Sequence, residues 1–262
     1  ILGQQMLTLI FRKIAQSNHW VTLIQRGPHC SINCGEYQQF SLKLITIEQL
    51  NKPSYIVRPR RHCEPIMNKP KWFDRAIFAK RVDAELEVEG CPIHYATWGD
   101  IGKPGIVLIH GSNAHLEWWR FVAPFLAGQF RIAVIDLSGN GDSGWRAEYN
   151  AELFVKEVMA VATHAELGPK PVIVGHSFGG YIALEAGYRY SSELGGVLFC
   201  DYVVPPAELF VQWGLRAQEN GPARPTRVYV DLDEALDRFR LLPEQPCQHP
   251  YVIQYIATQS LK

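Results

Sequence analysis

From about residue 76 onward, hydrophobic and polar residues follow regular patterns. In "DAELEVEG", acidic residues alternate with alanine, leucine and valine, which predicts a half-exposed strand. Gly90 then turns the chain, and "PIHYATWG" predicts the second strand of a hairpin. "GIVLIHG" is a short continuous apolar run, typical of a strand that is buried on both faces of a parallel sheet.

Strand and helix patterns then alternate. "EWWRFVAPFLAG" predicts one helix closed by Gly128, and "FRIAVIDLSGNGDSG" predicts a buried strand that ends in a glycine-rich loop. A helix over about 151–166 is followed by strand "PVIVG", helix "GGYIALEAGYRYS" and strand "GGVLFCD". This alternation predicts an α/β fold, with a mostly parallel sheet and helices on both faces.

Both ends of the chain differ from this middle part. Residues 1–75 lack periodicity and hold eleven Lys/Arg against four Asp/Glu, so we interpret them as a basic, poorly structured leader. After Asp201 the segments look helical and are interrupted by prolines, and "RVYVD" is the only candidate strand. The expected domains are the leader 1–75, an α/β core 76–204 and a helical segment 205–262.

Composition excludes several classes. The 262 residues contain 26 basic and 26 acidic side chains, and no apolar run is long enough to predict a membrane span. No signal peptide is recognisable, and the six scattered cysteines favour reduced thiols over a zinc site. We therefore expect a cytoplasmic protein without metal or cofactor. The leader could be a nucleic-acid-binding or membrane-binding arm, but we expect no nucleic-acid partner.

One motif indicates chemistry. Gly175, His176, Ser177, Phe178 and Gly179 form a Gly-x-Ser-x-Gly pattern between a predicted strand and a predicted helix. Such a turn holds the serine in a strained conformation with its hydroxyl projecting from the sheet. The two glycines are expected where side chains would collide with the neighbouring strand and helix. We interpret Ser177 as a nucleophile; the alternative is a glycine-rich packing turn.

A second motif supports this interpretation. His110 and Gly111 end the earlier buried strand, and the amide of Ser112 could donate to the same oxyanion as the amide of Phe178. The helix that begins near Phe178 also directs its positive dipole end at this place. We expect His110 to support the loop rather than to act as a base.

On these residues the chain resembles the α/β-hydrolase family. The resemblance covers roughly Val82 to Asp201 and includes the hairpin, "HGSNAHLEWW", "DLSGNGDSG" and "GHSFGG" in the family's order. It implies a Ser-His-acid triad, an oxyanion hole from the Ser112 and Phe178 amides, and a helical cap, to which 205–262 would belong. The serine disfavours dehalogenase and epoxide hydrolase chemistry, because those relatives use an aspartate as nucleophile.

The other triad members are harder to find. Family order requires an acid and then a histidine after the serine, and His249 is the only histidine that follows Ser177. No strand precedes His249, so we do not expect it to be the base. Asp201 is the candidate acid, and Asp136 is expected to hold its loop. We therefore expect the chain to stop inside the cap, without the last two strands, which would leave "GVLFCD" with an open edge.

The resulting prediction is a serine hydrolase similar to carboxylesterases, acting on a small ester or a related acyl or carbon–carbon bond. The partner is a small-molecule substrate, and the sequence does not indicate an oligomeric state. The alternative is a non-catalytic member of the same fold that binds a small molecule or a protein.

Overall fold

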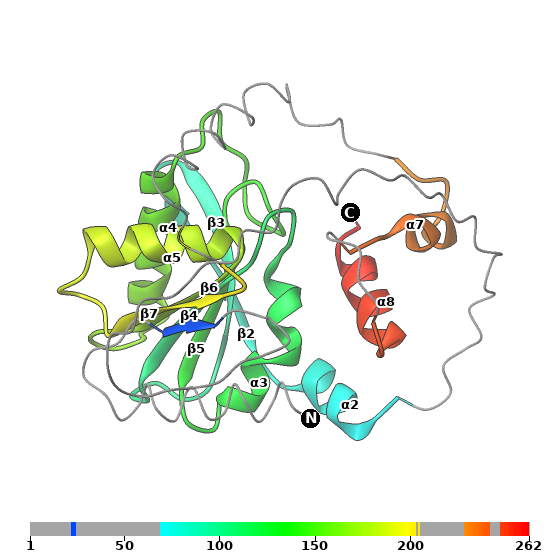
Figure 1. Ribbon diagram of the computed structural model, residues 1–262, viewed down its shortest axis with the longest axis horizontal. Helices are drawn as coiled ribbons and strands as arrows, with labels where there is room; N and C mark the ends of the chain where they lie inside the picture. The colour runs from blue at the N-terminus through cyan, green and yellow to red at the C-terminus, as the bar shows by residue number, and fades with distance from the viewer. Residues whose placement is uncertain (1–21, 25–68, 203, 205–227, 242–246, 262) are drawn as a thin grey trace, which may run out of the picture. The chain divides into compact units, whose positions relative to one another are not determined.

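The computed structural model describes residues 22–24, 69–202, 204, 228–241 and 247–261, all of which belong to one unit of the chain. Its centre is a seven-stranded sheet with the order β1-β7-β6-β4-β5-β3-β2 (Figure 1). The strands are β1 (Thr22–Ile24), β2 (Val82–Val88), β3 (Cys91–Trp98), β4 (Gly105–Ile109), β5 (Arg131–Ile135), β6 (Val172–His176) and β7 (Gly196–Cys200).

The sheet is mixed but mostly parallel, as predicted. β2 and β3 form the expected antiparallel hairpin, and β3 is also antiparallel to β5. The pairs β4–β5, β4–β6, β6–β7 and β1–β7 are parallel. The alternation in β2 is confirmed, since Leu86 and Val88 are more buried than Glu85 and Glu87.

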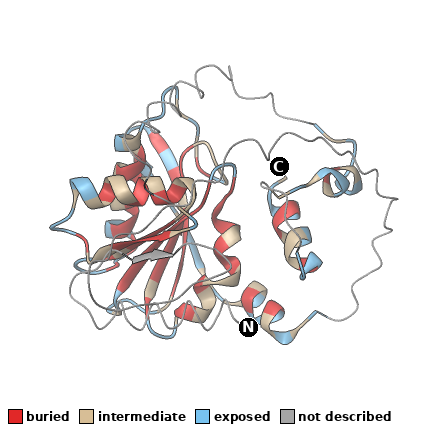
Figure 2. Ribbon diagram, in the orientation of Figure 1, coloured by how far each residue is buried: buried red, intermediate tan, exposed pale blue. Residues whose placement is uncertain are grey.

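Most residues of the central strands are buried, as the red ribbon in Figure 2 shows. Their apolar side chains belong to two core clusters. In β4, Val107 and Ile109 join one core cluster, and Ile106 and Leu108 join the other. The first cluster includes residues of α4 (Ala151–His164) and α5 (Phe178–Arg189), and the second includes residues of η2 (Leu116–Phe121) and α3 (Ala123–Leu126). Helices therefore cover both faces, as the continuous apolar strands predicted.

The prediction of one helix over "EWWRFVAPFLAG" was wrong. The structure has the 3₁₀ helix η2 and then the short helix α3, separated at Val122, where φ is −125°. Pro124 explains the break, because a proline lacks the amide hydrogen that a continuous helix needs and its ring clashes with the carbonyl of the preceding turn. Pro124 lies instead in the first turn of α3, where it is tolerated.

Strand β1 pairs with the edge of β7 that we expected to be open. Thr22, Leu23 and Ile24 lie parallel to Leu198, Phe199 and Cys200. The expectation of an unpaired edge is therefore wrong for these three positions, which find their partner in a segment of the leader. The remainder of residues 1–68 lies outside the described part of the chain.

Three further helices are described: α2 (Lys71–Phe78), α7 (Leu232–Arg238) and α8 (Pro250–Gln259). Helix α2 crosses the expected boundary at residue 75. Asp231 caps α7, because its side chain accepts a hydrogen bond from the Glu234 amide. "RVYVD" forms no strand over its described residues 228–231. Within the described ranges, every helix is too short or too polar to cross a membrane.

A buried ion pair holds the glycine-rich loop after β5. Arg146 donates to Glu157 of α4 (Nε–Oε1, 2.9 Å), and its other nitrogens donate to the carbonyls of Val88 and Glu89 in the β2–β3 hairpin. The second carboxylate oxygen of Glu157 accepts from the Ser138 amide. The two side chains are 7% and 0% exposed, so one pair joins the loop, the hairpin and α4 away from water.

We predict that Arg146→Met lowers the free energy of unfolding by about 3–5 kcal/mol, because it leaves the Glu157 carboxylate buried without its cation. Urea unfolding followed by circular dichroism measures this loss. Lys156→Met is the matched control, because Lys156 lies beside Glu157 on α4 but pairs with the exposed Glu89. It should cost far less. Equal losses in the two variants would contradict the role assigned to the buried pair.

Candidate functional site

The site lies where the direction of the sheet connections reverses. β4 and β6 are neighbours, but β4 leads into η2 and α3 on one face, whereas β6 leads into α5 on the other. In open α/β sheets such a reversal leaves a crevice outside the carboxyl ends of the two strands, where ligands bind. Here Gly111 follows β4 and Ser177 follows β6, so the two predicted motifs meet at the carboxyl ends of these neighbouring strands.

Ser177 has the strained backbone expected of a sharp strand-to-helix turn. Its φ is +50° and its ψ is −115°, values that a residue with a side chain rarely adopts and that cost about 1–3 kcal/mol. The Ser177 amide donates to the Cys200 carbonyl (3.0 Å), and its own carbonyl accepts from the Gly180 amide (2.8 Å). The turn is thus held from both sides, and the serine side chain is only half-buried.

The two glycines of the motif are required for close approach, as predicted. A Cβ atom added to Gly175 would lie 1.9 Å from the Gly179 carbonyl oxygen, at the start of α5. A Cβ on Gly179 would lie 2.7 Å from the Ile109 oxygen and 2.6 Å from the His110 oxygen. Neither approach is possible for an L-residue without moving backbone, so helix α5 contacts the ends of β6 and β4 through bare backbone.

The loop after β4 contacts the serine turn directly. A Cβ on Gly111 would lie 2.8 Å from Nδ1 of His176 and 3.4 Å from Cβ of Ser177. The loop then turns, with the Ala114 amide donating to the Gly111 carbonyl and with Asn113 at a φ of +53°. Gly111 therefore brings the Ser112 amide next to the turn that presents Ser177.

His110 supports this loop, as expected. It is 1% exposed, and its Nε2 accepts from the Leu137 amide (3.1 Å). Its Nδ1 must then carry the proton, which it donates to the Gly111 carbonyl (2.8 Å). Burial lowers the pKa of His110, and the neutral ring joins the loops that follow β4 and β5.

The two backbone amides that we selected for an oxyanion hole remain available. Phe178 is the first residue of α5, and Ser112 is exposed in the Gly111 loop. Neither amide donates a hydrogen bond to any residue that the structure describes. Amides at a helix N-terminus are also favoured next to negative charge by the helix dipole.

Asp201 directly follows β7, beside the serine turn. His176 pairs with Cys200 in the sheet, and the Ser177 amide donates to the Cys200 carbonyl, so Asp201 follows the residue that holds the turn. Its side chain is exposed and its φ is +54°. The sequence candidates Ser177 and Asp201 are therefore brought to neighbouring strand ends.

His249 lies elsewhere, as the N-cap residue of α8. Its Nδ1 bonds the Tyr251 hydroxyl (2.9 Å), and its ring contacts Trp72 of α2 with centroids 5.6 Å apart. Four other described histidines also have ring partners: His94 bonds Asp136, His110 bonds Gly111, His115 bonds Ser260 and His164 bonds Tyr95.

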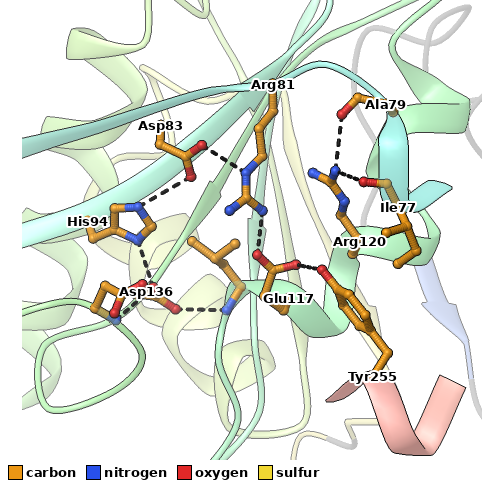
Figure 3. A network of polar contacts seen from close by, with 11 residues as sticks. Ile77, Ala79, Arg81, Asp83, His94, Glu117, Arg120, Asp136 and Tyr255 are labelled. Carbon is orange, nitrogen blue, oxygen red and sulfur yellow. Dashed lines mark hydrogen bonds and ion pairs between the residues drawn. The ribbon is translucent and has the colours of Figure 1, made fainter. Parts of the chain in front are cut away.

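Asp136 holds the loops around the site, as expected. This residue is 1% exposed, and its Oδ1 accepts from the Leu116 amide (2.7 Å). Its Oδ2 accepts from the Asp142 amide (3.1 Å) and contacts Nδ1 of His94 (2.9 Å), as Figure 3 shows for the labelled side chains. Burial opposes the charge of Asp136, but these hydrogen bonds outweigh it and lower the pKa of the carboxyl.

The ligand atoms of His94, Asp136 and Asp142 lie within 4.8 Å of one another, a separation at which they could hold a metal ion. Both oxygens of Asp136 already accept backbone hydrogen bonds, however, and His94 uses its Nδ1 on the same carboxylate. The group is therefore a hydrogen-bonded clamp that orients loops. Burial disfavours the charged form of His94, but Asp136 outweighs burial and raises the pKa of this ring.

The polar chain in Figure 3 also contains residues that sequence reasoning did not select. Glu117 accepts from Arg81 and from the hydroxyl of Tyr255 on α8. Tyr255 stands 138 positions away from Glu117, so no local spacing could have indicated this contact.

A histidine whose pKa is raised by folding stabilises the protein below its unfolded pKa of about 6.5, and the effect is lost as pH rises through the folded value. We therefore predict that His94→Gln destabilises the protein more at about pH 6 than at about pH 8.5. Urea unfolding of both proteins at the two pH values measures the difference. A loss of equal size at both would contradict this assignment.

The chain is similar to several known proteins. The profile of the alpha/beta hydrolase family matches residues 106–258, more than half of the chain. The pimeloyl-[acyl-carrier protein] methyl ester esterase of Edwardsiella ictaluri is 33% identical over 97 residues, which are 37% of this chain and 36% of that protein. Epoxide hydrolase 4 of Homo sapiens is 26% identical over 135 residues, or 50% of this chain and 36% of that protein. The matched part thus spans little more than a third of these relatives.

The fold has similar solved structures. The thioesterase domain from the curacin biosynthetic pathway superposes with a TM-score of 0.53 at 23% identity, over 69% of this chain and 67% of that domain. At this identity the likeness concerns the fold alone. Together with the strand order, the serine turn and the match over residues 106–258, it shows that the chain belongs to the α/β-hydrolase family.

Proposed function

We propose that this chain is part of a serine hydrolase that cleaves small carboxylic esters through an acyl-enzyme. The observation that carries the proposal is the strained Ser177, with φ +50°, beside the Gly111 loop at the reversal point of the sheet. A packing turn has no need to hold a serine in this conformation, whereas a nucleophile gains exposure and a fixed direction from it.

The proposed reaction has two steps. The Ser177 hydroxyl oxygen attacks the ester carbonyl carbon and its proton passes to a general base, while the amides of Ser112 and Phe178 bind the oxyanion. The tetrahedral species collapses, and the alcohol leaves with the proton. Water then attacks the acyl-enzyme by the same route, which releases the carboxylic acid and restores Ser177.

We propose a histidine outside the described residues as the general base. Support comes from the ring partners of His94, His110, His115, His164 and His249, which give each of these residues another function. His176 adjoins Ser177, but successive side chains at the turn diverge. A serine hydroxyl needs a neighbouring base to become nucleophilic at neutral pH, so the proposal requires this histidine.

The choice of ester chemistry follows from the residue at the turn. The relatives include a protein named as a methyl ester esterase and one named as an epoxide hydrolase. Family members of the epoxide hydrolase type use an aspartate as nucleophile, whereas this chain has Ser177. Serine favours acyl transfer, because its ester intermediate is readily attacked by water in the same oxyanion hole.

We predict that a fluorophosphonate probe labels the wild-type chain at Ser177, and that Ser177→Ala reduces labelling and hydrolysis of p-nitrophenyl acetate by about 10³-fold or more. Mass spectrometry of the labelled peptide identifies the site. The matched control is Ser191→Ala, an exposed serine beyond α5, which should label like the wild type. If the wild-type chain is not labelled, the non-catalytic binding protein becomes the better interpretation.

The acid is tested separately. If Asp201 orients the base, Asp201→Asn should slow labelling by about 10²- to 10⁴-fold, because the base then loses its correct tautomer and orientation. Asp231→Asn is a suitable control, since the Asp231 side chain caps helix α7. A normal labelling rate in Asp201→Asn would assign the acid to another carboxylate and leave the proposal for Ser177 intact.

A further inference from the structure

The loop that presents the Ser112 amide is attached to helix α8 at its other end. The loop begins at Gly111 beside Ser177, and residues 115–117 at its end contact α8. We propose that Glu117 and Tyr255 are positioning residues. Their contact fixes the position of the loop that carries the Ser112 amide relative to α8. This inference rests on the proposed function, because it assumes that the Ser112 amide binds the oxyanion.

The first contact joins Tyr255 to Glu117. The Tyr255 hydroxyl donates to Oε2 of Glu117 (2.7 Å), while Oε1 of Glu117 accepts from Arg81. Arg81 in turn pairs with Asp83 of β2 (2.9 Å). Glu117 is 8% exposed, so its carboxylate depends on these two donors rather than on water. Figure 3 shows this chain of contacts from Asp83 to Tyr255.

The Tyr255 hydroxyl keeps its proton at neutral pH. Burial raises the pKa of this phenol, and the hydrogen bond to the Glu117 carboxylate raises it further. The neutral phenol is the form that can donate to a carboxylate, so the contact persists through the pH range in which a serine hydrolase works. Tyr255 also packs edge-on against Phe121 of η2, with ring centroids 5.5 Å apart.

The second contact joins Ser260, which directly follows α8, to His115. The Ser260 hydroxyl donates to the Ile256 carbonyl (2.7 Å), so its oxygen accepts from Nε2 of His115 (2.8 Å). His115 is itself 7% exposed. Helix α8 and the residue that follows it therefore contact Glu117 and His115, on either side of Leu116.

The residue between these contacts is held from the opposite direction. The Leu116 amide donates to Asp136, and the Ala114 amide closes the turn on the Gly111 carbonyl. Only two residues separate Ser112 from this anchored stretch. A displacement of residues 115–117 should therefore also displace the Ser112 amide. A displacement of about 1 Å at a catalytic group can lower a rate by about 10²-fold.

Tyr255→Phe tests the coupling, because it removes the donor but keeps the ring that packs on Phe121. We expect kcat for p-nitrophenyl acetate and the rate of fluorophosphonate labelling to fall about tenfold, while KM stays within about twofold. The lost interaction would act on the transition state, whereas a general loss of structure would lower the melting temperature without this split. Tyr251→Phe is the matched control, since this α8 hydroxyl bonds His249 and not the loop.

The outcomes separate the two proposals. Normal labelling of a folded Tyr255→Phe protein would overturn the coupling and leave the serine hydrolase intact, as would equal slowing in Tyr251→Phe. A wild-type chain that is not labelled would overturn both. If Tyr255→Phe fails to fold, Ser260→Ala breaks the second contact instead, with Thr258→Ala as control, because the Thr258 hydroxyl bonds only the Gln254 carbonyl. A normal rate in Ser260→Ala would then overturn the coupling.

Discussion

The approach of bare backbone between helix α5 and the ends of two strands is the constraint on which the site depends. Side chains at Gly175 or Gly179 would overlap carbonyl groups at 1.9 Å and 2.6 Å, so only glycine allows the helix to begin where it does. That early start forces Ser177 into a positive φ, and the strain is held by hydrogen bonds to β7 and within α5. Local strain of this kind persists only when the surrounding structure fixes it from several sides.

The loop after β4 also approaches the serine turn closely, at Gly111. Gly111 lies against Ser177 and His176, so a side chain there would displace the His176 ring. The loop is supported on its other side by buried polar residues. His110 and Asp136 provide this support, one through the Gly111 carbonyl and the other through the Leu116 amide. The polar groups around the site are thus mainly supports for backbone, which is how a site built on loops can keep precise geometry.

Sequence reasoning found the parts of the site whose signal is local. Ser177, its two glycines and His110–Gly111 stand next to buried apolar strands, and the period of hydrophobicity located those strands correctly. It misjudged the helix interrupted by Pro124, and it expected an open edge where β1 pairs with β7. It also did not select Glu117 or Tyr255, because an ion pair or a hydrogen bond between distant segments leaves no periodic trace in the chain.

The hydrogen bonds that hold this loop connect it to different parts of the structure. Asp136 directly follows β5 of the sheet, so its bond to Leu116 fixes the loop relative to the core. Tyr255 belongs to α8, a helix outside the sheet, so its bond to Glu117 fixes the same loop relative to that helix. A loop held by only one of these contacts would follow either the sheet or α8. Adjacent residues are held by both. If the Ser112 amide binds the oxyanion, as proposed, the position of α8 is then part of the catalytic geometry.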